Sequence, residues 1–143
     1  GLDRQWQPFP EVGVRRPSRG WIDLALFHRG DRVIVATEIQ SELRRLEQLL
    51  RWSGEKARSL PSWEGWTRMG VEPAISSLLL IRSTRATRAV AEEFGRLIRT
   101  AYPAHPDDGL ASITAGHPWP GPCLLWAIQD REAAGLYRMV ARP

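Results

Sequence analysis

Cysteine and lysine are almost absent from this chain of 143 residues, which contains one of each, Cys123 and Lys56. A single cysteine excludes an internal disulfide and a C-x-x-C metal site, so we expect a reducing, cytoplasmic location. Long apolar runs are also missing: the longest, near Leu78–Ile81, is far shorter than the ~18–20 residues that span a bilayer. We therefore expect no membrane partner.

Internal repeats and low-complexity tracts are lacking as well. What remains has an ordinary globular composition, with 43% hydrophobic and 25% charged residues, which excludes a wholly disordered chain. The length predicts a single domain over residues 1–143. The chain begins with Gly1 and has no basic-apolar leader, which indicates a fragment of a longer chain and no secreted precursor.

Basic residues outnumber acidic ones, giving a net charge of +4 and a sequence pI near 10.2. A polyanion such as DNA is therefore an expected partner, because clustered arginines release counterions when they meet phosphates. Three arginines, Arg15, Arg16 and Arg19, lie in one turn-like segment. They either contact a phosphate backbone or belong to a plain solvated loop.

A β-hairpin is predicted from two segments of strand-like composition, Trp21–Phe27 and Val33–Gln40, joined by a short turn. If the turn closes around Arg29 and Gly30, Asp23 lies opposite Ala36 and diagonal to Glu38. The Cβ atoms of Asp23 and Glu38 would then be roughly 7–8 Å apart, on one face of the sheet. Two such carboxylates could share a divalent cation, and the alternative is an edge hairpin with solvated polar residues.

The remaining pattern alternates helices and strands, which predicts an α/β domain with a mixed β-sheet, an antiparallel hairpin and flanking helices. Residues 1–10 are expected to be an extended lead-in, and residues 103–122 a proline- and glycine-rich excursion. The other expected elements are strands at 11–14, 74–81 and 123–128, a helix capped by Ser41 and bounded by Pro61, and a helix from Ser83 or Thr84 to about Tyr102.

Asp23, followed after fourteen intervening residues by Glu38-Ile39-Gln40 and an amphipathic helix, resembles the PD-(D/E)xK, or restriction endonuclease-like, nuclease superfamily. The run from Glu11 to Leu43 is similar to a nuclease-like domain found beside helix-turn-helix domains in bacterial proteins. The resemblance implies an αβββαβ-type core, in which the first helix can be missing. It also implies hydrolysis of DNA phosphodiester bonds with Mg²⁺ or Mn²⁺.

The resemblance also assigns metal ligands. Asp23 and Glu38 would be the metal-ligating carboxylates, and the carbonyl oxygen of Ile39 a further ligand. Glu11 matches an upstream acidic position that can complete the site. Hard oxygen ligands of this kind suit Mg²⁺.

Gln40 takes the position that usually holds the catalytic lysine in this superfamily. An amide carries no charge and is no useful proton carrier at neutral pH. Lys56, on the following helix, matches a basic position there and is the candidate to supply a charge from another direction. It is equally explained as a solvated residue near Glu55.

Three functions therefore remain open at this stage. The first is a metal-dependent endonuclease, and the second is a catalytically weakened nuclease fold that serves as a nucleic-acid-binding or regulatory module of a transcription regulator. The third is a homo-oligomerisation domain whose exposed tryptophans form an interface. A tethered helix-turn-helix domain is a further partner that the resemblance implies.

Overall fold

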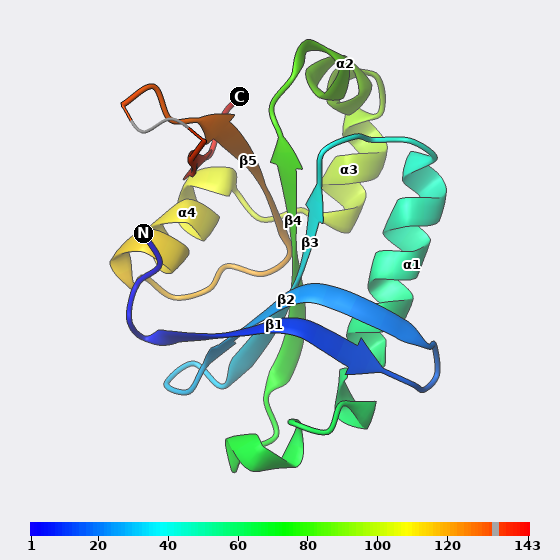
Figure 1. Ribbon diagram of the computed structural model, residues 1–143, viewed down its shortest axis with the longest axis vertical. Helices are drawn as coiled ribbons and strands as arrows, with labels where there is room; N and C mark the ends of the chain where they lie inside the picture. Colours follow the sequence, from blue (N-terminus) through cyan, green and yellow to red (C-terminus); the bar gives the residue numbers. More distant parts are fainter. Residues whose placement is uncertain (133–134) are drawn as a thin grey trace.

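One mixed β-sheet forms the centre of the protein in the computed structural model, which describes residues 1–132 and 135–143 (Figure 1). Within these residues the sheet has six strands in the order β1-β2-β3-β4-β5-β6. The strands are β1 (Trp6–Val14), β2 (Gly20–His28), β3 (Val33–Gln40), β4 (Ala74–Arg82), β5 (Cys123–Gln129) and β6 (Tyr137–Val140).

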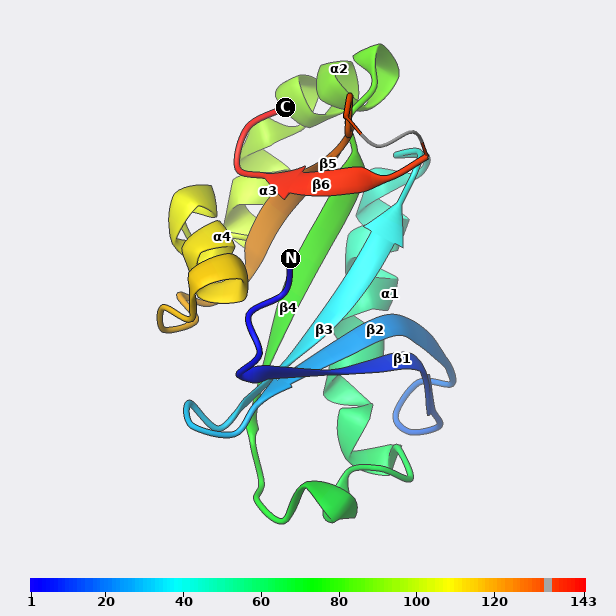
Figure 2. The ribbon, with the colours of Figure 1, turned by 60° about the vertical axis from the view of Figure 1, so that its left-hand side comes forward.

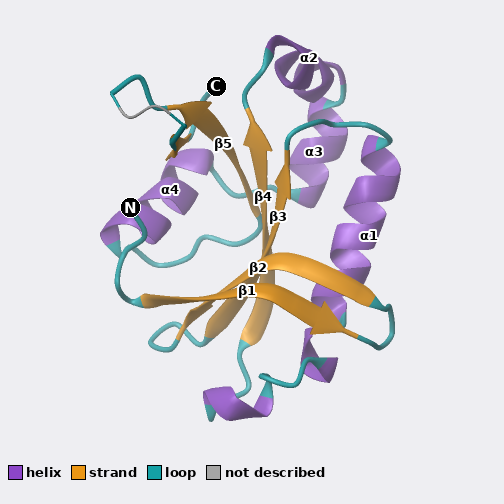
Figure 3. Cartoon of the chain, viewed as in Figure 1, coloured by secondary structure: helices purple, strands orange, loops and turns teal. Residues whose placement is uncertain are grey.

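Helices connect the later strands (Figure 3). They are α1 (Leu46–Arg58), α2 (Arg85–Glu93), α3 (Gly95–Ala101) and α4 (Pro106–Ala115), with 3₁₀ turns η1 (Leu60–Ser62) and η2 (Thr67–Met69) before β4. None of the helices in the described ranges is long and apolar enough to cross a membrane.

The sheet combines two pairing modes (Figure 2). The first three strands pair antiparallel, whereas β3, β4 and β5 are parallel to one another and β6 is antiparallel to β5. The predicted mixed α/β sheet with an antiparallel hairpin and crossover units is confirmed at this level.

Helices cover both faces of the sheet. On one face, α1 and η1 contribute Ala57 and Leu60 to a core with β1, β2 and β3, while α3 contributes Ile98 to a neighbouring core. On the other face, α4 contributes Ile113, which packs with residues of β3, β4 and β5. Trp63 and Trp66, in the segment after α1, also pack against the first of these cores.

The register between β2 and β3 differs from the prediction by two residues. Ala36 pairs with Ala25 rather than with Asp23, and the ladder closes at His28 and Val33. The turn is therefore wider than expected, with Arg32 in the left-handed conformation at φ 50° and its N–H donated to Arg29 O at 3.2 Å. A shift of two residues keeps the side chains of the paired residues on their predicted faces, since side chains alternate with a period of two.

The expected lead-in of residues 1–10 is wrong in its second half, because β1 begins at Trp6 and not at Glu11. Trp6 is buried, and its indole N–H donates a hydrogen bond to the Ser112 carbonyl at 3.0 Å. Prolines at positions 8 and 10 are tolerated because β1 is an edge strand, where a missing N–H leaves no ladder partner unpaired.

The first helix starts later than predicted. Its N-cap is Arg45, in the left-handed conformation at φ 50°, and Ser41 does not cap it. The intervening chain places Leu43 in the core, which holds the segment in a non-helical path.

The helix after β4 is correctly capped but is not continuous. Of the two caps that the sequence predicts, Ser83 and Thr84, the structure uses Thr84, whose side chain accepts the Thr87 N–H in a capping box. The segment then divides at Phe94 (φ −103°, ψ 26°) into α2 and α3.

The predicted excursion over residues 103–122 is wrong, because it contains α4. Pro106 begins this helix, the side chain of His105 accepts the Asp107 N–H, and Gly116 ends it at φ 76°. Proline at the first position and glycine just past the last are ordinary helix boundaries, so the two residue types that predicted a loop are in fact the ends of a helix.

Candidate metal and nuclease site

Asp23 lies where the β2–β3 ladder ends. The last paired residues are Leu24 and Thr37, and the next positions along the two strands are Asp23 and Glu38. One carboxylate oxygen of Asp23, Oδ2, accepts the Ile39 backbone N–H at 2.8 Å. The side chain thus takes the place of a main-chain partner and is fixed beside Glu38.

Glu38 is buried, with 4% of its surface exposed, on the face of β3 that α1 covers. Its Oε1 atom lies 2.7 Å from the Nζ atom of Lys56. The contact is an ion pair whose orientation is poor for a hydrogen bond, so this buried oxygen has no aligned donor. A carboxylate at such a position requires a cation nearby, because burial without compensation is costly.

Lys56 reaches this point from α1. Its ammonium group donates a hydrogen bond to the Trp21 carbonyl at 2.8 Å in addition to pairing with Glu38. Its aliphatic part packs over Gly20, where an added Cβ would lie 3.1 Å from the lysine Cδ. Lys56 is therefore a fixed component of the site. Its side chain is only 21% exposed, so it is not a solvated residue.

The pKa of Glu38 depends on its burial and on the charges of Lys56 and Asp23. Burial raises the pKa of Glu38 from 4.5 to about 7; the Lys56 ammonium acts in the opposite direction, and the Asp23 carboxylate raises the pKa further. The effect of the Asp23 carboxylate on the pKa of Glu38 means that the two carboxyl groups lie close together, as two ligands of one cation must.

Tyr102 is a neighbour that the sequence did not indicate. It ends the helical segment α3 and is buried, and burial together with the charge of Glu38 raises the pKa of Tyr102 to about 12. No spacing rule links residues so far apart in sequence, and only the packing of α3 against the sheet brings Tyr102 near the carboxylate.

Glu11 is not gathered into this site. It is exposed in β1 with φ 52°, between the paired residues Pro10 and Val12. Phe9 and Val12, three residues apart, both pack against the same core, so the strand's alternation is interrupted at this point. Among the described residues no group of three or more His, Cys, Asp or Glu side chains is arranged to hold a metal ion.

Gln40 and Ile39 occupy the last two positions of β3. Gln40 is half-buried and aligned with Ile81 of β4, and it shares the face of Glu38 by strand alternation. The Ile39 side chain is exposed, and its N–H is the group that Asp23 holds.

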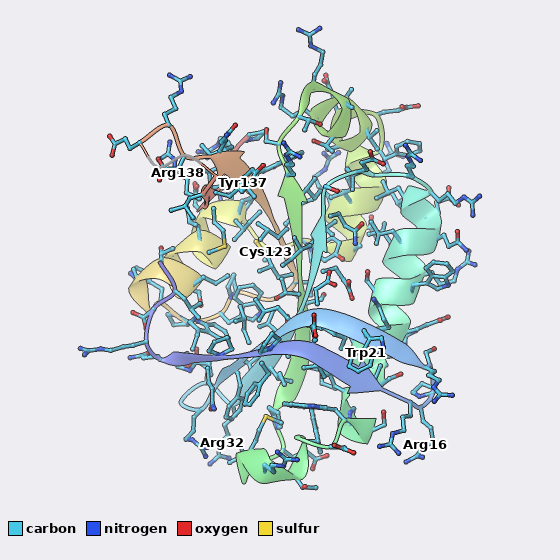
Figure 4. The ribbon with its side chains drawn as sticks, in the orientation of Figure 1. Arg16, Trp21, Arg32, Cys123, Tyr137 and Arg138 are labelled. Atoms are coloured by element: carbon cyan, nitrogen blue, oxygen red, sulfur yellow. The ribbon has the colours of Figure 1, made fainter. Side chains whose placement is uncertain are left out.

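The three predicted nucleic-acid contacts lie at the β1–β2 turn (Figure 4). Arg15 pairs with Glu64 at 3.3 Å, and the backbone N–H groups of Arg15 and Arg16 both donate to the hydroxyl of Ser62. The side chains of Arg16 and Arg19 are exposed.

The donor set fits a hydrated magnesium or manganese ion. Mg²⁺ keeps several waters and binds proteins through one or two carboxylates plus a substrate phosphate. Asp23 and Glu38 supply two carboxylates, no third acidic side chain joins them among residues 1–132 and 135–143, and the buried Oε1 of Glu38 lacks an aligned donor. The ion would compete with the Lys56 ammonium for Glu38.

Comparison of the chain with protein-family models, curated proteins and solved structures gave no match. The site is therefore interpreted from its own residues.

Proposed function

We propose that this chain is a divalent-metal-dependent nuclease domain that hydrolyses DNA phosphodiester bonds, built on a restriction endonuclease-like core. The observation that carries the proposal is the convergence of Asp23 and Glu38 from adjacent strands with Lys56 from the following helix. In this proposal Asp23 and Glu38 hold Mg²⁺ or Mn²⁺, and the Ile39 carbonyl completes the protein ligands.

The ion, when bound, would lower the pKa of a coordinated water and stabilise the charge that develops on the phosphate. The protein's own residues position these groups. Asp23 is oriented by the Ile39 N–H, and Lys56 places one positive charge at the carboxylates without help from Gln40. Lys56 is thus the residue proposed to replace the usual catalytic lysine.

A second function is supported by the same ion pair. Lys56 already neutralises Glu38, and Glu11 supplies no third ligand within the described part of the chain. A nuclease fold that has lost catalysis and binds nucleic acid as a regulatory module would keep this scaffold. In that case Lys56 and Glu38 would stabilise the domain and would not act on a phosphodiester.

Cleavage separates the two functions. Purified protein is incubated with plasmid and with single-stranded DNA in Mg²⁺ or Mn²⁺, beside Asp23→Asn and the control Asp108→Asn on α4, on the opposite face of the sheet. The nuclease proposal expects cutting by wild type and by the control, and none by Asp23→Asn. DNA binding without cutting in all three proteins would favour the regulatory module.

A further inference from the structure

Trp21 is the most exposed of the large hydrophobic side chains in the described residues, with 67% of its surface accessible. It projects from the β1–β2 hairpin, as Figure 4 shows, two residues before Asp23 on the same strand. A large aromatic ring left in water next to a candidate active site requires a reason other than core packing.

The backbone holds this ring in place. Trp21 pairs with Gly13 of β1, and a Cβ at Gly13 would lie 3.1 Å from the indole, so the benzo edge of the ring rests directly on the glycine. A side chain at position 13 would require the indole to move by a few tenths of an ångström. One side of the ring is therefore supported by β1, and the rest remains accessible.

Lys56 connects the backbone of Trp21 to the carboxylate of Glu38. Its ammonium donates to the Trp21 carbonyl and pairs with Glu38, so the residue that carries the ring is tied to the candidate metal site by one side chain.

Trp21 also lines a groove that contains positive charge. Arg15, Arg19 and Trp63 line the same groove, together with Glu11 and Glu64. Arg15 is balanced by Glu64, but Arg19 forms no ion pair with any described residue, and the exposed Arg16 adjoins it on the same turn. Arginine side chains that can contact phosphates thus lie next to an exposed indole on which a base can stack.

We infer that this hairpin binds single-stranded DNA, with an unpaired base stacked on Trp21 and phosphates contacting Arg16 and Arg19; the inference rests on the proposed nuclease function. Bases in a duplex are stacked on one another and offer no free face, whereas an aromatic side chain stacks readily on an unpaired base. The substrate class is therefore single-stranded DNA.

Binding is tested without metal, so that cleavage plays no part. Fluorescence anisotropy of a labelled oligothymidylate, and of a duplex of equal length, is measured in EDTA with wild type, Trp21→Ala, Trp21→Phe and Tyr137→Ala. Tyr137 is a suitable control because it is also an exposed aromatic residue, 48% accessible, on β6 far from the hairpin (Figure 4).

Trp21→Ala should weaken oligothymidylate binding by about 5- to 150-fold, the usual effect of removing one stacking residue. Trp21→Phe should retain most of the affinity, and Tyr137→Ala all of it. Wild type should bind the single strand more tightly than the duplex. Circular dichroism and thermal unfolding establish that each variant is folded.

Equal binding by Trp21→Ala and wild type would overturn the inference, as would equal affinity for single strand and duplex. A mass that depends on concentration in wild type but not in Trp21→Ala, with DNA binding unchanged, would assign the ring to an interface between two copies of the chain. Absence of cleavage in Mn²⁺ would contradict the nuclease proposal alone, because the binding assay contains no metal.

Discussion

The Oδ2 atom of Asp23 accepts the backbone N–H of Ile39 at 2.8 Å, just beyond the last paired residues of the two strands, Leu24 of β2 and Thr37 of β3. This bond continues the strand pairing through a side chain at the point where the main chains stop pairing. It directs one carboxylate oxygen of Asp23 to the main chain of β3.

Replacing Asp23 separates its structural and chemical roles. Asparagine keeps an acceptor for Ile39, so Asp23→Asn should unfold at nearly the wild-type urea concentration, whereas Asp23→Ala should lose about 0.5–1 kcal/mol. Both should lack metal-dependent cleavage, because neither retains the negative charge. If Asp23→Asn cut plasmid at the wild-type rate, Asp23 would not be a metal ligand.

The raised pKa of Glu38 predicts a pH-dependent stability. Between the ordinary value of 4.5 and the folded value of about 7, the folded state holds a proton that the unfolded state has released. The contribution of Glu38 to stability is thus fully present below pH 4.5 and is lost as the pH rises through about 7. The free energy of unfolding of wild type minus that of Glu38→Gln should fall across this range.

Urea unfolding from pH 4.5 to 8 measures this difference, starting at the ordinary pKa of the side chain. Glu93→Gln, at an exposed position of α2, is the matched control for the substitution itself. A flat difference for Glu38→Gln would mean that the pKa of Glu38 is not raised in the folded protein.

Removing Lys56 should destabilise the protein, because the buried Glu38 carboxylate would lose its ion-pair partner. In Lys56→Met the pKa of Glu38 rises further, because the ammonium that lowers it is gone. We expect a loss of about 3–5 kcal/mol at pH 8, as when one partner of a buried pair is removed. The loss should be smaller at pH 5, where Glu38 is protonated.

Lys56→Arg and Arg58→Met serve as comparisons in the same unfolding experiment. The arginine variant retains the charge and should lose less than Lys56→Met, and Arg58 is exposed in the same helix. Equal losses for Lys56→Met and Arg58→Met would show that the pair with Glu38 contributes nothing specific.

Two glycines that lie in helices, Gly54 and Gly109, should respond in opposite directions to substitution by alanine. Gly54 in α1 has room for a methyl group, whose nearest neighbour would be the flexible end of Arg58 at 3.3 Å, so Gly54→Ala should stabilise the protein by about 0.4–1 kcal/mol. In α4, a Cβ at Gly109 would lie 2.5 Å from the sulfur of the buried Cys123, so Gly109→Ala should destabilise it. Thermal unfolding of both variants tests the pair, and a gain at both positions would contradict the packing of α4 on β5.

Local pattern was sufficient to predict the hairpin and its two carboxylates. The register was wrong by two residues because sequence does not specify how His28 uses its ring: Nδ1 accepts the Asp31 N–H at 3.0 Å and widens the turn. The alternation argument does not extend to Asp23, because the ladder ends at Leu24 and Thr37; the hydrogen bond from the Ile39 N–H to Asp23 Oδ2 is what fixes Asp23 beside this part of β3.

Other features depended on information that the sequence expresses only weakly. The boundaries of α4 are a proline and a glycine, which also mark loops, so the helix was missed although His105, Pro106 and Gly116 together form a start and a stop. The burial of Lys56 and the approach of Tyr102 depend on how α1 and α3 pack on the sheet, which no short spacing encodes.

Because Lys56 is the only lysine in the chain, amine-reactive reagents can modify only this side chain and the amino terminus. The ammonium is held by Glu38 and Trp21, so its rate of acylation, followed by mass spectrometry, reports directly on whether the ion pair is closed. Any cation that displaces Lys56 from the carboxylate should speed that single labelling event, which gives this protein an internal chemical probe of its own site.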